Sequence, residues 1–164
     1  MLPETQKLER EIQQLVDRIP TIHREYMAKL VGIAVDELVF HSPVLTGAYR
    51  ASHAVGTGTA SGVPTSVVYE SPDHPEADRE LVLGAQPILT PPMGFEARAA
   101  VLAEAPFQSY LLFNDRFYAD RVEFGWPTRA GYGVYHAAET ITEQAAQLVA
   151  QLPLDWEKFG GKLL

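Results

Sequence analysis

The chain is organised around the stretch Tyr118-Ala119-Asp120-Arg121-Val122-Glu123-Phe124-Gly125-Trp126, with Tyr110-Leu111-Leu112-Phe113-Asn114 just before it. Residues 110–114 have the composition of a strand, and the Asn-Asp pair that follows tolerates turn geometry. On one helical turn Tyr118 and Val122 would share a face. Gly125 would then stand where a helix end needs a residue with positive φ. The stretch predicts a strand, a tight turn, one helical turn and a stop.

N-terminal to this stretch, apolar residues recur with the three-four spacing of an amphipathic helix. In residues 5–19 they are Leu8, Ile12, Leu15, Val16 and Ile19. Pro20 either separates this helix from a second one capped by Thr21, or kinks one long helix. The second part carries Ile22, Tyr26, Leu30, Ile33, Ala34 and Leu38, and the Ser42-Pro43 pair ends it. We expect the whole apolar stripe to be buried, in the core or against another subunit.

Thr46-Gly47 predicts a turn that feeds a strand through Tyr49, Ala51, His53 and Val55. The glycines of residues 56–62 lack the spacing and the following Lys-Ser/Thr of a phosphate loop, so this run is expected to be a hairpin tip. Residues 66–69 supply the returning strand.

Two further helices are predicted towards the C-terminus. Residues 95–105 are alanine-rich and place Phe95, Ala99 and Leu102 in helical register. The last helix begins at residues 133–136, ends at Pro153 and has the stripe Val134, Ala138, Ile141, Ala145, Leu148, Val149 and Leu152. The remaining tail, with Trp156 and Phe159, is expected to pack on the domain or on a neighbour.

The length and composition suit one globular domain. The chain has 164 residues, of which 46% are hydrophobic and 21% charged. The order of elements predicts an α+β fold, an antiparallel β-sheet packed with N-terminal and C-terminal helices. Residues 1–164 form the single domain, with a helical part at 1–41, sheet and helices at 42–152 and a tail at 153–164.

Two motifs occur in a fixed order along the chain. The first is Ser42-Pro43-Val44-Leu45-Thr46-Gly47-Ala48-Tyr49-Arg50-Ala51-Ser52, and the second is Asn-x-x-x-Tyr-Ala-x-x-Val-Glu-Phe-Gly at residues 114–125, followed by Gly-Val at 133–134. In sequence, order and spacing they resemble siphophage neck or tail-completion proteins, the small subunits that join phage head and tail. The resemblance implies a structural motif made of Thr46, Gly47, Arg50, Asn114, Tyr118, Glu123 and Gly125.

The resemblance also implies a function. It implies a non-enzymatic virion protein, made in the host cytoplasm, that forms a hexameric ring at the phage neck or tail. Its partners would be copies of itself, head-closure or connector proteins, and tail-terminator or tail-tube proteins, with DNA passing through the ring without specific binding. A tail-terminator subunit is the alternative within this class. A small ligand-binding or hydrolase α+β domain is the alternative outside it.

The charge bears on the partners. With 21 acidic and 13 basic residues the net charge is −8, which disfavours gripping DNA or an anionic membrane. No apolar run is long enough to span a bilayer. Acids concentrate at Glu70, Asp73, Glu76, Asp78 and Glu80. This acidic loop is either a solvated face or, in a ring, the wall of the axial channel that keeps DNA from sticking.

Few residues point to catalysis. The chain has no cysteine, and none of its five histidines lies in a metal or hydrolase motif, so no cofactor, metal or catalytic residue is predicted. His136 and Glu139 share a helix face and could form half of a metal site, or simply a solvated helix start. Glu123 lies between two apolar residues and could have a raised pKa, but an ion pair with Arg50 or Arg121 is favoured because no nucleophile accompanies it.

Overall fold

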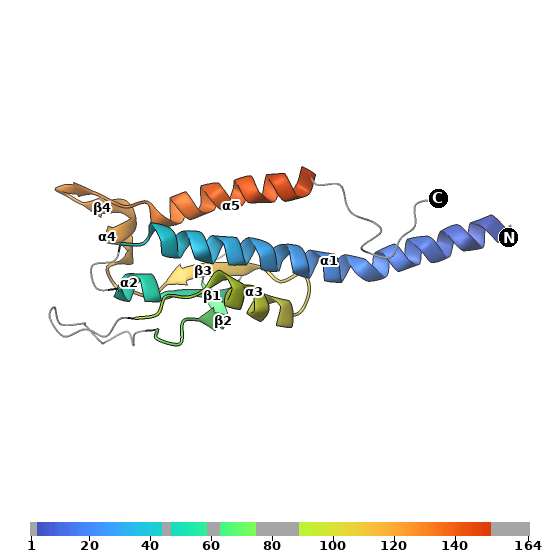
Figure 1. Ribbon diagram of the computed structural model, residues 1–164, viewed down its shortest axis with the longest axis horizontal. Helices are drawn as coiled ribbons and strands as arrows, with labels where there is room; N and C mark the ends of the chain where they lie inside the picture. Colours follow the sequence, from blue (N-terminus) through green and yellow to red (C-terminus); the bar gives the residue numbers. More distant parts are fainter. Residues whose placement is uncertain (1–2, 44–46, 59–62, 75–88, 152–164) are drawn as a thin grey trace.

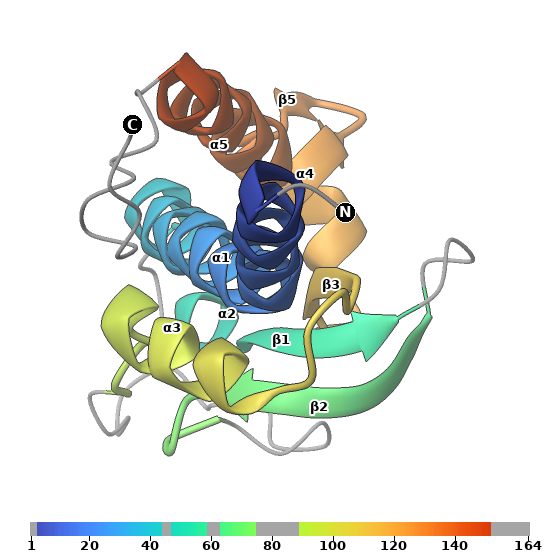
Figure 2. The ribbon, with the colours of Figure 1, turned by 90° about the vertical axis from the view of Figure 1, so that its right-hand side faces the viewer.

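The computed structural model describes residues 3–43, 47–58, 63–74 and 89–151. Its elements in chain order are α1 (Pro3–His41), α2 (Ala48–Ala51), β1 (His53–Gly58), β2 (Pro64–Glu70), α3 (Gly94–Ala103), β3 (Tyr110–Asn114), α4 (Ala119–Phe124), β4 (Gly125–Trp126), β5 (Arg129–Ala130) and α5 (Val134–Gln151). A three-stranded antiparallel sheet, in the order β2-β1-β3, packs against helices (Figures 1 and 2). The predicted α+β class is confirmed.

Helix α1 organises the rest of the molecule. It runs for 39 residues, about 58 Å, with Pro20 inside it. The one-helix interpretation is therefore right, and a separate helix capped by Thr21 is wrong, because one missing N–H does not outweigh good helix-forming sequence on both sides. The helix ends at His41, as the Ser42-Pro43 pair predicts.

One core cluster joins α1 to the sheet and to α3. Its buried members are Ala28, Val31, Val35, Val55, Ala97 and Val101. Helices α1 and α3 approach closely because Gly32 and Gly94 face each other, and a Cβ on Gly94 would collide with the Gly32 carbonyl. Asp36 of α1 accepts a hydrogen bond from the Gly94 N–H (2.9 Å), which satisfies one free donor at the start of α3. A carboxylate there also suits the helix dipole.

A second core cluster joins α1 to α2, α4 and α5. It contains Leu38, Tyr49, Val122, Val134 and Ala138. Tyr26 donates to the Ala146 carbonyl (3.5 Å) further along the same pair of helices. Leu38 thus meets the start of α5 and Tyr26 meets its later part, so the two helices are antiparallel. Figure 1 shows α5 lying along the C-terminal half of α1.

The sheet confirms the predicted antiparallel pairing of the strand through His53 and Val55 with the returning strand. β1 pairs with β2 in antiparallel register, Ala54 opposite Glu70, and on its other side with β3, His53 opposite Asn114. Residues 59–62, at the predicted hairpin tip, lie outside the described residues, as does the predicted C-terminal tail.

Two local predictions are wrong. Residues 48–51 form the helical turn α2, and the strand begins only at His53, because Gly47 (φ 75°) turns the chain into a helical conformation first. In α3 the buried residues are Gly94, Ala97 and Val101, whereas Phe95 is exposed. The small residues of α3 face α1 because the two backbones approach so closely, and this leaves the large side chain outside.

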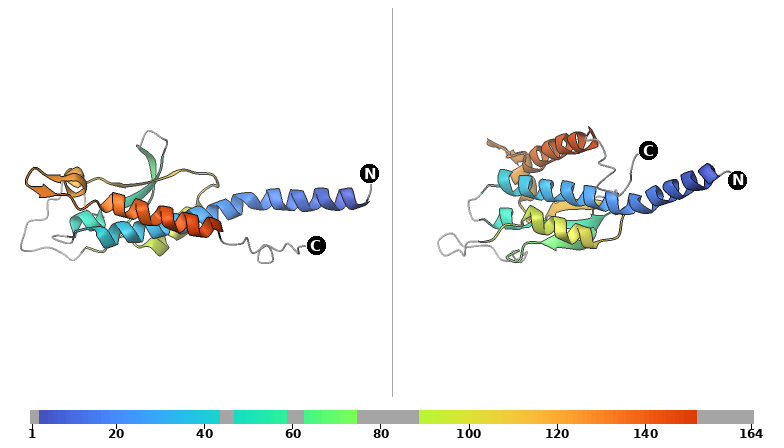
Figure 3. Two further views of the ribbon diagram at one scale, coloured as in Figure 1. Left: turned by 90° about the horizontal axis from the view of Figure 1, so that it is seen from above. Right: turned by 45° about the vertical axis from the view of Figure 1, so that its right-hand side comes forward.

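Of the two alternatives for the first stripe, burial in the core of the chain is wrong. Residues 3–19 of α1 project beyond the other helices and strands (Figures 1 and 3). All five apolar side chains predicted for this segment are exposed, namely Leu8, Ile12, Leu15, Val16 and Ile19. In contrast, Val35 and Leu38 in the second half are almost completely buried.

Candidate functional site

The two sequence motifs meet in space at one end of the molecule. They bring together the end of α1, helix α2, the end of β3, helix α4 and the start of α5, and this region is called the motif junction below. Each described motif residue has a structural contact there. Thr46 lies outside the described residues.

Gly47 begins helix α2, and Arg50 links this helix to α1. Gly47 has φ 75°, a conformation that favours glycine, and its carbonyl accepts the Ala51 N–H (2.9 Å). Arg50 donates from Nε to the Val39 carbonyl (3.0 Å), one of the last carbonyls of α1 that lacks a partner within the helix. Arg50 therefore acts as a cap on α1.

Asn114 connects the end of β3 to α2. Its amide nitrogen donates to the Tyr49 carbonyl (2.9 Å), and its amide oxygen accepts the Arg116 N–H (3.1 Å). Both ends of the amide are thus used, which orients the turn that leads into α4. This explains the need for an amide side chain at this position.

Tyr118 and Gly125 delimit helix α4. Tyr118 packs on the second core cluster, and its ring lies 6.3 Å from that of Tyr49. Gly125 has φ 95° and ψ −177°, and a Cβ there would collide with the backbone of residues 129–131. The positive φ agrees with the prediction. The extended ψ sends the chain directly into the β4-β5 hairpin (Figure 2).

Glu123 caps the last helix. Its carboxylate oxygens accept the N–H groups of Tyr135 (2.9 Å) and His136 (3.1 Å), in the first turn of α5. In the described part of the chain no ion pair joins Glu123 to Arg50 or Arg121, so the predicted pairing is wrong although a structural role is found. A carboxylate is preferred here because two unpaired N–H donors and the helix dipole both favour a negative charge.

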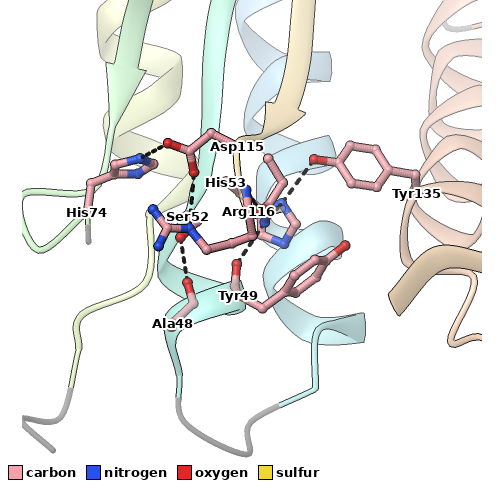
Figure 4. A network of polar contacts seen from close by, with 9 residues as sticks. Ala48, Tyr49, Ser52, His53, His74, Asp115, Arg116 and Tyr135 are labelled. Atoms are coloured by element: carbon pink, nitrogen blue, oxygen red, sulfur yellow. Dashed lines mark hydrogen bonds and ion pairs between the residues drawn. The ribbon is translucent and has the colours of Figure 1, made fainter. Parts of the chain in front are cut away.

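Behind the motif junction, the buried side chains of Ser42 and His53 and the half-buried Tyr135 form a polar cluster, of which Figure 4 shows His53 and Tyr135. Ser42 Oγ lies 2.6 Å from His53 Nε2 and 2.6 Å from the Leu38 carbonyl oxygen. Tyr135 Oη lies 3.2 Å from His53 Nδ1. Burial lowers the pKa of His53 to about 3, so its ring is neutral near pH 7.

The direction of these hydrogen bonds opposes a catalytic role for Ser42. A carbonyl only accepts, so Ser42 donates to Leu38, and His53 must then donate from Nε2 to Ser42. Nδ1 accepts from Tyr135. A neutral histidine in this tautomer cannot take the proton of Ser42. Burial likewise raises the pKa of Tyr135 and of Tyr49, so both phenols stay protonated.

The described part of the acidic loop is anchored at its base. Asp73 accepts the Thr90 N–H (3.1 Å), and hydrogen bonds to Thr90 hold the pKa of Asp73 below its usual range. Ser71 donates to the Thr90 carbonyl. Next to it, His74 contacts Asp115 (3.1 Å, Figure 4). Glu70 is exposed at the end of β2, whereas Glu76, Asp78 and Glu80 lie outside the described residues.

No group of three metal-ligating side chains exists in the described ranges, and His136 and Glu139 are both exposed. Among the same residues, no helix is long and apolar enough to cross a membrane.

Two contacts at this end could not have been identified from the sequence. Asp36 is one of many acids on an amphipathic helix, and only the packing of α3 shows that it caps Gly94. The partnership of His53 with Tyr135 joins residues 82 positions apart. Its only signal in the sequence was the histidine within an apolar strand pattern.

Comparison with known proteins does not identify a family: no family model, curated protein or solved structure matches this chain.

Proposed function

We propose that this chain is a structural subunit of a tailed phage, a neck or tail-completion protein that forms a ring between the head connector and the tail. The observation that carries the proposal is the exposed apolar stripe on residues 8–19 of α1. Monomeric proteins rarely expose a contiguous apolar surface of this kind, and such surfaces mark interaction sites. A subunit that completes its fold only by contact with neighbours suits an assembly role.

The motif junction supports the same proposal. The contacts of Arg50, Asn114 and Glu123 all connect helices and strands within the chain. These bonds hold α2, α4 and α5 in fixed positions at the end of α1. A rigid body with one projecting helix is what a ring subunit requires, because the ring closes only if each copy presents the same angle.

In this proposal the partners are other copies, head-closure or connector proteins, and tail-terminator or tail-tube proteins. DNA passes through the ring without specific binding, in keeping with the net charge of −8. The acidic loop would line the channel. Asp73, the anchored acid at its base, should then face the axis of the ring; a position on the outer rim would exclude this part of the proposal.

The test is complementation in a phage that encodes this chain. Deleting the gene should leave DNA-filled heads and separate tails in electron micrographs, and gold-labelled antibody should bind wild-type particles at the junction between head and tail. A label at the top of detached tails would favour a tail terminator instead. Normal particles after deletion would contradict both assignments.

A matched pair of variants tests the role of the stripe. Ile12→Asp places a charge on the exposed apolar face, and Gln14→Asp places the same charge on another face two residues away. Both should fold, since residues 3–19 lie outside the core clusters. We expect Gln14→Asp to restore joined particles and Ile12→Asp to fail. If the two variants complement equally well, the stripe has no role in joining heads to tails.

A further inference from the structure

The exposed stripe on the projecting half of α1 has the geometry of a helix-pairing seam. Leu8, Ile12, Leu15 and Ile19 are spaced by four, three and four residues, and their exposed fractions are 56%, 53%, 40% and 46%. This spacing places them at alternating d and a positions of a heptad repeat. A free helix of about this length is marginal in water, so it gains stability from a partner along the seam.

The same face of α1 already accepts an antiparallel helix further along. Tyr26 lies seven residues after Ile19 and donates to Ala146 of α5. Ile22 and Ile33 on that side are partly buried. The seam on residues 8–19 therefore continues the surface on which α5 packs, past the point where α5 leaves it.

We propose that the seam is occupied by the seam of a second copy of this chain, packed antiparallel. Two copies would be related by a twofold axis near residues 13 and 14. Leu8 then faces Ile19 of the second copy, and Ile12 faces Leu15, so an a position meets a d position in every layer. The pairing is self-complementary, because each contact is made twice.

The charges beside the seam select this orientation. Glu11 is exposed and Arg18 is half-buried, and the two occupy the same flanking position, one heptad apart. In the antiparallel pair Glu11 of each copy lies beside Arg18 of the other, which gives two attractive pairs at the centre of the seam. Glu4 and Glu25 form a repulsive pair at each end. In a parallel pair Glu4 would lie beside Glu9 of the second copy and Glu11 beside Val16, with repulsion and no compensating pair. Charge complementarity thus favours the antiparallel arrangement.

This dimer goes beyond the proposed ring and does not depend on it. Neighbours in a ring with one polar axis are not antiparallel, so the dimer is a form of the free protein. In that form the apolar stripe is covered, and it becomes available to other partners only when the two copies separate.

Disulfide trapping tests the orientation directly, because the natural chain contains no cysteine. Leu8→Cys and Ile19→Cys proteins, one carrying a mass tag, are mixed and oxidised mildly. The antiparallel dimer predicts the mixed disulfide as the main product, with Gln14→Cys as the control that does not cross-link. A Leu8→Cys homodimer as the main product would show parallel pairing and overturn the proposal.

Charge reversal tests the same arrangement without cysteine. Sedimentation velocity of the full chain should show a reversible dimer as the concentration rises from about 1 μM to about 1 mM, the range of a small interface. Glu11→Arg should weaken association about tenfold, and Glu11→Arg with Arg18→Glu should restore it. A monomer throughout this range would mean that residues 152–164 of the chain or another protein cover the seam, and would overturn the proposal. So would a Glu11→Arg variant that associates normally.

Discussion

Residues 3–19 and residues 20–41 belong to one continuous helix and carry apolar residues at similar spacing, yet their surroundings are opposite. Leu38 is 1% exposed, because the sheet, α2 and α5 surround the second half, whereas Leu15 is 40% exposed. Apolar periodicity therefore predicts that a helix face will be buried, but it does not predict whether the same chain or another chain buries it. The apolar side chains of the first half are exposed, and we propose that a second copy covers them.

The largest difference in stability is expected between two variants that truncate a leucine, one in each half of α1. Leu38→Ala leaves a cavity in the second core cluster and should lower the free energy of unfolding by about 2–5 kcal/mol. Leu15→Ala removes a surface side chain and should change it by at most about 0.5 kcal/mol. Urea unfolding of dilute protein measures both. Equal losses would mean that the first half is also covered within the monomer.

Lowering the pH should destabilise the region around the buried half of α1, through His53. His53 bonds to Ser42 directly after α1, and its pKa is lowered from 6.5 to about 3 by burial. Its contribution to stability is complete above pH 6.5 and is lost as the pH falls towards 3, at about 1.4 kcal/mol per pH unit. Between pH 7 and pH 5 the wild type should lose about 2 kcal/mol more than His53→Gln. If both lose the same amount, His53 is not buried in the neutral form.

The cap formed by Glu123 at the start of α5 should also stabilise the buried half of α1, because α5 packs against that half. Glu123→Ala leaves two N–H groups at the start of α5 without their acceptor and should cost about 1–2 kcal/mol. Glu139 is an exposed acid on α5, and Glu139→Ala serves as the control that should cost less than about 0.5 kcal/mol. A similar loss for the two variants would argue that the Glu123 contacts contribute little.

The elements that depend on local sequence could be predicted. Strand β3, the stop at Gly125, the single turn of α4 and the start of α5 follow from turn residues and periodicity. Contacts over long sequence separations could not. The sequence indicated a structural role for Glu123 but not its partners. These partners are backbone N–H groups, which almost every residue has, so no sequence pattern favours them over Arg50 or Arg121. The inward face of α3 was missed because glycine at a close helix crossing overrides the preference for burying phenylalanine.

Amide hydrogen exchange along α1, measured by mass spectrometry on dilute and on concentrated protein, shows whether the first half of this helix is covered only by another copy. The buried residues 28–39 should exchange slowly at both concentrations. Residues 8–19 should exchange rapidly in dilute protein, since no core holds their helix in place, and slow by about tenfold in concentrated protein, when copies cover the seam. Slow exchange of residues 8–19 at every concentration would show that the monomer covers them itself and would contradict the account.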